Sequence, residues 1–204
     1  MNRYLRLATV LTTTLTLASM SFAQQPRDVE IKNVPFVSQL SATCKPNYLC
    51  HYACAAMVAG KAWGGNWATT STMQSLAKQV KGSTCPNSLS DVMNAKNAIN
   101  TWGNTKGARA DYGNFDGLKA KIAAGRPASV SILYSEIGND RFDKNWSKGH
   151  QVVVIGYSET NQTWTYLDPL AKSAGKKTIA STTFRNAVSK LDGQSTGFYY
   201  LTCE

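Results

Sequence analysis

Histidines are few in this sequence, and closely paired cysteine motifs are missing. The 204 residues include two histidines and five cysteines, with no C-x-x-C and no C-x-x-C-H. These absences exclude a thioredoxin-like redox pair and a c-type haem attachment site. Structural zinc commonly takes two clusters of closely spaced ligands, but outside the segment Cys50-His51-Tyr52-Ala53-Cys54 the cysteines are dispersed. We therefore expect no metal and no cofactor.

Acidic residues are also scarce. Twelve aspartates and glutamates face 22 lysines and arginines, which gives a net charge of +10. A basic excess can favour anionic partners such as cell-wall polymer, lipid headgroups or nucleic acid. The basic residues are scattered, however, and their longest run is Lys176-Lys177. We predict that the charge belongs to the general surface and that the protein does not bind nucleic acid.

Internal repeats and long linkers are absent, and the one marked apolar run lies at the N-terminus. Residues 1–23 contain Arg3 and Arg6, then a largely apolar stretch, then Ser21-Phe22-Ala23, which is the layout of a secretory signal peptide. The threonines and the short length do not suit a membrane span, which needs about 20 apolar residues. We expect removal of residues 1–23, leaving a mature chain 24–204 with a net charge of +8. This chain is predicted to be one domain, secreted or periplasmic, and not integral to a membrane.

Two patterns divide the mature chain. After an extended lead at 30–39, helix-favouring segments cover 50–59 (closed by Gly60), 70–81, 89–100 (capped by Ser88 or Ser90) and 115–124. Short β-branched and aromatic runs then cover 128–134, 151–157, 163–167, 177–180 and 197–202. Helices followed by strands predict an α+β domain in which a helical lobe faces an antiparallel sheet.

The helix at 50–59 carries the best candidate nucleophile. Cys50 stands at its amino end, where the helix dipole and unpaired N–H groups lower a thiol pKa. Cys54 lies one turn further in, where burial acts the other way, so it suits a disulfide or the core. Consecutive helical residues do not face each other, so we assign His51 to packing or to the surface. His150 is then the one general base for the thiol.

A hairpin brings a carboxylate to His150. The segment 150–168 shows a strand, a polar turn and a strand, and a turn centred near Glu159 or Thr160 pairs residues whose numbers sum to about 318–320. His150 and Asp168 fit this sum, which predicts that they face each other across the hairpin. A carboxylate there holds the imidazole in one tautomer. Asp168 also precedes a proline, and Asp-Pro commonly opens a turn after a strand.

Four short motifs together resemble those of bacterial papain-like cysteine peptidases. They are VPFVSQ at 34–39, CHYACAAM at 50–57, GHQVVVIGY at 149–157 and YLDP at 166–169. The resemblance includes staphopains, plant-pathogen effector peptidases with a C-W-A-A-S-x-x-M helix, and bacteriocin-processing peptidases with C-G-P-x-x-x-x-M. In these patterns an apolar residue follows the nucleophile by seven positions, as Met57 follows Cys50.

The resemblance implies a papain-like fold and a role for each matched residue. Cys50 would be the nucleophile, His150 the general base and then acid, and Asp168 the group that orients the imidazole. Gln39 would complete the oxyanion hole with the Cys50 backbone N–H. Two departures stand out: Gln39 precedes Cys50 by eleven residues, which leaves Asn47 as a substitute, and His51 replaces the usual Trp or Gly.

The odd number of cysteines agrees with a free nucleophile. With Cys50 free, two disulfides are expected among four cysteines in three possible connectivities. These four are Cys44, Cys54, Cys85 and Cys203.

The sequence therefore predicts a cysteine hydrolase that forms a thioester with a peptide-type acyl group. Its partner is a protein or peptide, with the stem peptide of peptidoglycan as a second substrate class. Acyl transfer to an amine is an alternative reaction, and a papain-like binding or toxin module is the non-enzymatic alternative. Trp63 and Trp67 either line the cleft or pack in the core, and Trp146 is placed to shield the imidazole. Neither subsite preference nor oligomeric state follows from the sequence.

Overall fold

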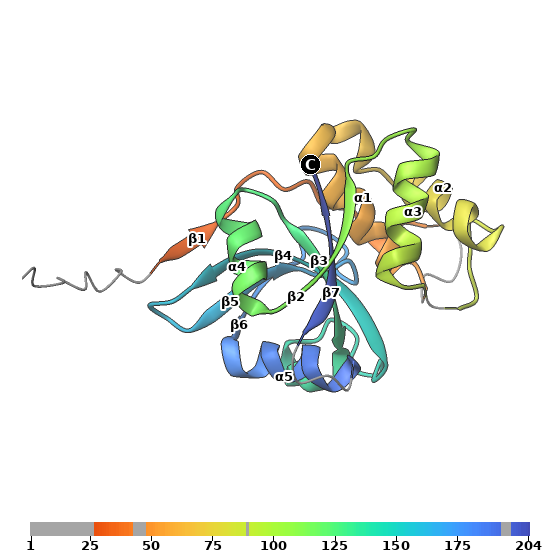
Figure 1. The fold of residues 1–204 in the computed structure, drawn as a ribbon. Coiled ribbons are helices and arrows are strands. Elements are labelled where there is room, and N and C mark those ends of the chain that lie inside the picture. Colours follow the sequence, from red (N-terminus) through yellow and green to blue (C-terminus); the bar gives the residue numbers. More distant parts are fainter. Residues whose placement is uncertain (1–26, 43–47, 89, 193–196) are drawn as a thin grey trace, which may run out of the picture.

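The computed structural model describes residues 27–42, 48–88, 90–192 and 197–204 (Figure 1). Its helices are α1 (Cys50–Trp63), α2 (Thr70–Lys81), α3 (Val92–Trp102), α4 (Phe115–Ala123) and α5 (Ser181–Asp192), with 3-10 turns η1 (Gln39–Ser41), η2 (Gly65–Trp67) and η3 (Tyr134–Asp140). Its strands are β1 (Asp28–Glu30), β2 (Ala108–Gly113), β3 (Ala128–Leu133), β4 (Gly149–Ser158), β5 (Thr163–Leu167), β6 (Lys176–Ala180) and β7 (Phe198–Cys203). The predicted α+β architecture is confirmed.

The strands form one antiparallel sheet. Its order is β2-β7-β3-β4-β5-β6, and β1 pairs with β4. Helices α1, α2 and α3 gather on one side, while α4 and α5 lie against the rest of the sheet (Figure 1). The helical lobe beside the sheet is thus the predicted arrangement, with α5 as an added helix in the half that was expected to hold strands alone.

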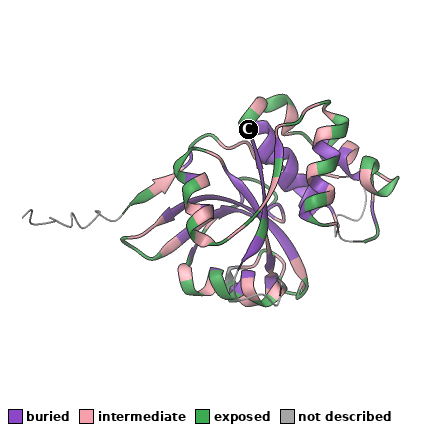
Figure 2. Ribbon diagram, viewed as in Figure 1, coloured by how far each residue is buried: buried purple, intermediate pink, exposed green. Residues whose placement is uncertain are grey.

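Strand β4 is buried on both faces and separates two cores. Val153 and Ile155 pack with α1, α2 and α3, whereas Val152 and Val154 pack with α4 and α5. This alternation explains the unbroken apolar run, since a strand covered on both sides has no polar face. The buried colouring runs through the centre of the sheet and through α1 (Figure 2).

Helix α1 is longer than predicted because Gly60 does not end it. The helix continues to Trp63 and closes at Gly64, which has φ 111° and donates its N–H to the Gly60 carbonyl. A Cβ at Gly60 would lie 2.7 Å from the Cβ of Ala68 and 3.0 Å from Pro35 Cγ. Glycine is therefore required there by the close approach of neighbouring chain, not as a cap.

The ends of other helices and strands show which local sequence signals were sufficient to predict them. The predicted bounds of α2 and β5 are confirmed, and α2 begins after Thr69, whose side chain accepts from the Thr72 N–H. Neither Ser88 nor Ser90 caps α3. Its N-cap is Asp91, which accepts from the Asn94 N–H at 2.7 Å. Strand β2 and helix α5 were not predicted.

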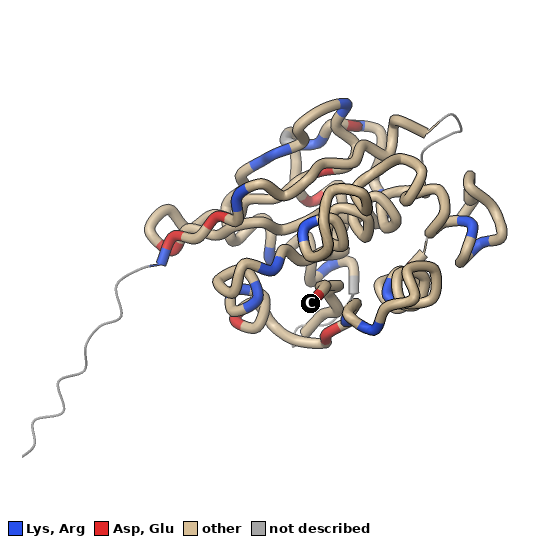
Figure 3. Tube along the Cα trace, turned by 90° about the horizontal axis from the view of Figure 1, so that it is seen from above, with Lys and Arg blue, Asp and Glu red and all other residues tan. Residues whose placement is uncertain are grey.

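Basic side chains are distributed along the fold. Lysine and arginine positions occur on several separate elements of the trace (Figure 3). Lys119, Lys121, Lys176 and Lys190 each pair with a carboxylate. Among the described residues, no helix has the length and apolar character needed to cross a membrane.

Candidate active site

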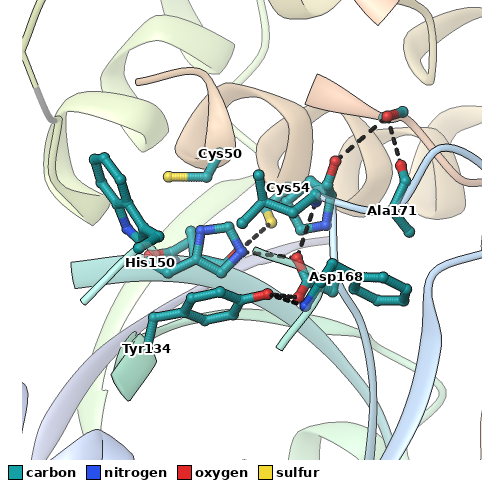
Figure 4. A network of polar contacts seen from close by, with 12 residues as sticks. Cys50, Cys54, Tyr134, His150, Asp168 and Ala171 are labelled. Carbon is teal, nitrogen blue, oxygen red and sulfur yellow. Dashed lines mark hydrogen bonds and ion pairs between the residues drawn. The ribbon is translucent and has the colours of Figure 1, made fainter. Parts of the chain in front are cut away.

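A buried imidazole and a buried carboxylate meet at the ends of β4 and β5. His150 Nε2 lies 2.8 Å from Asp168 Oδ1, and both side chains are almost fully excluded from solvent. The same Oδ1 accepts the Leu170 backbone N–H at 2.9 Å. The predicted contact between these two residues is confirmed, and Asp168 also organises the turn after β5, as the Asp-Pro interpretation suggested (Figure 4).

The pairing register beside this contact has one of the two predicted index sums, 320, and not the sum of 318 that would set His150 directly opposite Asp168. Near the turn, Ser158 pairs with Thr163, and an irregularity in β4 shifts the register further along, where Val153 pairs with Leu167. Continued by one residue, that register sets Asp168 opposite residue 152 instead of His150. The two side chains therefore meet diagonally past the end of the paired region.

Tyr134 is a third buried member of this cluster. Its hydroxyl donates to Asp168 Oδ2 at 2.7 Å and accepts the Phe142 backbone N–H at 2.9 Å. Its ring packs edge-on against His150, with centroids 4.5 Å apart. Burial and the neighbouring Asp168 carboxylate raise the Tyr134 pKa, so the phenol stays protonated and donates. Tyr134 was not predicted as a site residue, because no local motif marks it.

Cys50 starts α1, as predicted, and Figure 4 shows it on the helix that faces His150. Burial acts to raise the pKa of this thiol, but hydrogen bonds from His150 and His51 outweigh it and lower the pKa to about 5. Because Nε2 of His150 is bonded to Asp168, Nδ1 is the nitrogen left for the thiol. The site therefore favours a thiolate at neutral pH.

The pKa values of His150 and Asp168 are both shifted so that the charged form of each group is favoured. Burial acts to lower the pKa of His150, but bonds to Asp168 and Cys50 prevail and raise it to about 9. Burial acts to raise the Asp168 pKa, and the His150 contact with the other donors reverses this and lowers it. At neutral pH the three groups form an alternating chain of thiolate, imidazolium and carboxylate.

His51 is buried, as the packing assignment predicted, but the prediction that it does not face Cys50 is wrong. His51 Nδ1 lies 3.7 Å from Cys50 Sγ, although consecutive helical residues do not usually face each other. Cys50 is the first residue of α1, so no preceding helical turn restricts its side chain. Nδ1 is also the ring nitrogen nearest the backbone, which lets it reach back along the helix.

Gln39 is brought beside the carboxylate turn. Its backbone N–H donates to the Pro169 carbonyl at 2.9 Å, and its neighbour Ser38 donates to the Ala171 carbonyl at 2.6 Å (Figure 4). These bonds attach the N-terminal lead to the segment after Asp168. Gln39 is buried, whereas its alternative, Asn47, lies outside the described residues.

This constellation agrees with a family match over most of the chain. The model of the family described as Peptidase_C39 like matches residues 31–196. The chain belongs to the Peptidase_C39-like family. It is therefore a cysteine peptidase, and the predicted resemblance to papain-like cysteine peptidases is confirmed.

A solved structure supports the fold of this C39-like peptidase. A crystal structure of a C39-like peptidase from Bacillus anthracis is similar, with a TM-score of 0.62 and 19% identity over 85% of this chain and 97% of that chain. At this identity the likeness establishes the fold alone. Xylellain, a cysteine protease from Xylella fastidiosa, aligns less well, with a TM-score of 0.40 and 12% identity over 87% of this chain and 85% of that chain. No curated protein matches the sequence.

The other cysteines of the C39-like chain do not form the two predicted disulfides. Cys54 and Cys203 are free thiols in the core. Cys54 donates to the Gln151 carbonyl at 3.4 Å, which holds it against β4. Burial raises the pKa of Cys54 well above its usual value and that of Cys203 to about 12. Cys54 is thus the packed core thiol of the two roles considered, and Cys44 lies outside the described residues.

The tryptophans divide between the site and the core of the helical lobe. Trp146 donates to the Gly149 carbonyl at 3.1 Å and meets Tyr48, two residues before Cys50, edge-on at 6.2 Å. Both contacts are with residues one or two positions from His150 and Cys50, and shielding of the imidazole by Trp146 stays a prediction. Trp63 and Trp67 instead pack together at 4.9 Å, and Trp63 is about 20 Å along α1 from Cys50. Among the described residues, no group of three His, Cys, Asp or Glu side chains could hold a metal ion.

Proposed function

We propose that this C39-like peptidase is a secreted enzyme that cleaves peptide bonds through a thioester formed on Cys50. His150 serves as general base and acid, and Asp168 orients its imidazole. The observation that carries the proposal is a thiol whose pKa is lowered to about 5 beside an imidazole bonded to a carboxylate at 2.8 Å. Such a pair supplies a nucleophile and a proton donor at the same pH.

Acylation starts with attack of the Cys50 thiolate on the carbonyl carbon of the scissile peptide bond. The oxygen becomes an oxyanion, which the Cys50 backbone N–H and Gln39 stabilise as the oxyanion hole. The intermediate collapses as the C–N bond breaks, and the leaving amine takes the proton of the His150 imidazolium. The products of this half are the thioester and the free amine.

Deacylation uses the same groups in the reverse sense. His150 is now neutral and takes a proton from water as the water oxygen attacks the thioester carbonyl. When the C–S bond breaks, sulfur keeps the electron pair, and the carboxylic acid leaves. The thiolate–imidazolium pair is restored, and Asp168 holds the ring in one orientation throughout.

Secretion is the second part of the proposal. Residues 1–23 have the layout of a signal peptide, and its cleavage leaves a single-domain chain starting at Gln24. An enzyme outside the cytoplasm can meet either protein substrates or the stem peptides of peptidoglycan, and the same thioester can also pass to an amine. Expression of the full chain, followed by N-terminal sequencing of the exported product, tests this part. A cytoplasmic product that retains Met1 would contradict it.

The decisive experiment compares two cysteines of the same helix. Mature protein, Cys50→Ala and Cys54→Ala are incubated with casein and with purified peptidoglycan, each with and without an added amine. We expect Cys50→Ala to lose all turnover with its circular dichroism spectrum unchanged, and Cys54→Ala to retain it. The cleaved or amine-coupled products identify the substrate class and the reaction. Turnover by Cys50→Ala would overturn the assigned nucleophile, and a fully folded wild-type protein that only binds these polymers would favour a binding module.

A further inference from the structure

A second imidazole lies against the nucleophile. His51 Nδ1 is 3.7 Å from Cys50 Sγ, within the longer range of hydrogen bonds to sulfur. The two side chains are largely buried, with 7% of His51 and 1% of Cys50 exposed. The contact is therefore shielded from most of the water that would otherwise compete for the thiolate.

The two imidazoles beside Cys50 are not equivalent. Asp168 bonds to His150 at 2.8 Å, which fixes that ring and favours its protonated form. The Asp168 carboxylate is bonded to His150, so it orients that ring and not the His51 ring. His51 instead places Nδ1 toward Cys50 Sγ, where an Nδ1–H can donate a hydrogen bond, while His150 exchanges the catalytic proton.

We propose that His51 is a further catalytic residue, whose Nδ1–H donates a hydrogen bond to the Cys50 thiolate alongside His150. This role rests on the proposed function of Cys50 as the nucleophile. Its effect is largest when negative charge sits on sulfur. That occurs in the resting enzyme and again in deacylation, when the C–S bond breaks and sulfur takes the electron pair.

The donor from His51 has a distinct use in that second step. His150 has just taken a proton from the attacking water, and the departing sulfur needs a donor at the same moment. A second N–H on the thiolate makes sulfur a better leaving group without taking part in proton transfer. Loss of His51 is therefore expected to slow deacylation as well as to weaken the resting thiolate.

Other ionisable groups around the thiol provide the background for a pH test. Those that interact with Cys50 among the described residues are His51, Tyr52 and Cys54 of α1 and His150 of β4. Asp168 acts on Cys54 and His150. Tyr52 and Cys54 stay neutral over the range in which the Cys50 thiolate forms, because burial raises the pKa of each. If substitution of His51 changes the pH at which the Cys50 thiolate forms, the change therefore reports on the His51 contact.

Three variants at position 51 separate a donor from a packing group. His51→Ala removes the ring, His51→Asn keeps an N–H near the Nδ1 position, and His51→Gln moves the amide one bond further out. The rate of alkylation of Cys50 by iodoacetamide is measured against pH for each unreduced mature protein, with circular dichroism to verify folding. The expected shift for His51→Ala is an increase in midpoint of about one pH unit, or about tenfold slower alkylation below the midpoint. His51→Asn should stay near wild type, and His51→Gln should resemble His51→Ala.

The outcomes distinguish this inference from the function on which it rests. A wild-type midpoint near that of an ordinary thiol, about 8.5, would reject the proposed activation of Cys50 itself. If the wild-type midpoint is low and His51→Ala has the same midpoint, the role of His51 alone is overturned. The same conclusion follows if the midpoint rises equally in His51→Asn and His51→Ala. A low wild-type midpoint raised in His51→Ala and restored in His51→Asn supports both.

Discussion

His150 Nε2 and Asp168 Oδ1 lie 2.8 Å apart, although the two residues do not face each other in the register of β4 and β5. A diagonal contact past the last paired residues leaves the imidazole free to turn its Nδ1 to the neighbouring lobe. There it meets the first residue of α1. The proposed catalytic pair thus joins the end of an interior strand to a helix N-terminus, and Asp168 anchors the sheet side.

The activity should depend on pH with two limbs. Since the pKa of Cys50 is lowered to about 5, the thiolate is lost as pH falls through that value. Since the pKa of His150 is raised to about 9, its proton is lost as pH rises through that value. We expect a bell-shaped profile of kcat/KM between these limits. Asp168→Asn removes the charge that helps raise the His150 pKa, so its alkaline limb should move to lower pH. A flat wild-type profile would count against the pair.

Tyr134→Phe should disturb the site without touching the nucleophile. The variant loses the donor to Asp168 Oδ2 and the acceptor for the Phe142 N–H, which are 2.7 and 2.9 Å from the hydroxyl. Leaving buried polar groups unpaired costs about 1–3 kcal/mol, and a displaced imidazole lowers kcat/KM by about ten- to a hundredfold. Chemical denaturation and peptide hydrolysis measure the two effects. Tyr200→Phe in β7 is the matched control, and equal activity losses in both variants would show that Tyr134 has no special role.

Thiol counting tests the corrected cysteine assignment. Cys50, Cys54 and Cys203 are free, whereas Cys85 is disulfide-bonded. Unreduced native protein should take one iodoacetamide adduct, on Cys50, because its lowered pKa makes it a thiolate whereas the raised pKa values of Cys54 and Cys203 keep them protonated. Unreduced denatured protein should take three, and Cys85 should be recovered in a disulfide-linked peptide. Intact mass with peptide mapping measures this, and a single adduct after denaturation would restore the two-disulfide scheme.

Gly60→Ala should destabilise the fold. The new methyl would lie 2.7 Å from the Ala68 Cβ and 3.0 Å from Pro35 Cγ, so α1 or the chain beside it must move. Overpacking of this kind costs about 1–3 kcal/mol, which thermal or urea unfolding detects. Gly65→Ala, with no atom within 4 Å of the new methyl, serves as the control. If Gly60→Ala were as stable as Gly65→Ala, the close approach would not explain the glycine.

Local patterns were sufficient for most of the elements and for the placement of Cys50, His150 and Asp168. Residues 70–81 and 163–167 carry their own start and stop signals, and the structure has both elements with those bounds. Cys50 at a helix start and His150 near Asp168 followed from spacing. Helix α5 also carried a local signal that was missed, because Phe184, Ala187 and Val188 are buried at helical spacing.

The tertiary structure decided the features that depend on contacts between segments far apart in the sequence. The polar sequence of β2 becomes a strand because Ala108 to Gly113 pair with β7, almost a hundred residues later. Tyr134 reaches Asp168 across 34 positions, and the thiols of Cys54 and Cys203 stay apart within one core. Sequence alone determined the α+β order, the helix that begins at Cys50 and the histidine–carboxylate pair, since caps, alternation and hairpin spacing act over a few residues. Register, the third member of the cluster and the contact of His51 with the thiol required the packed lobes, because only the folded chain sets the geometry of long-range contacts.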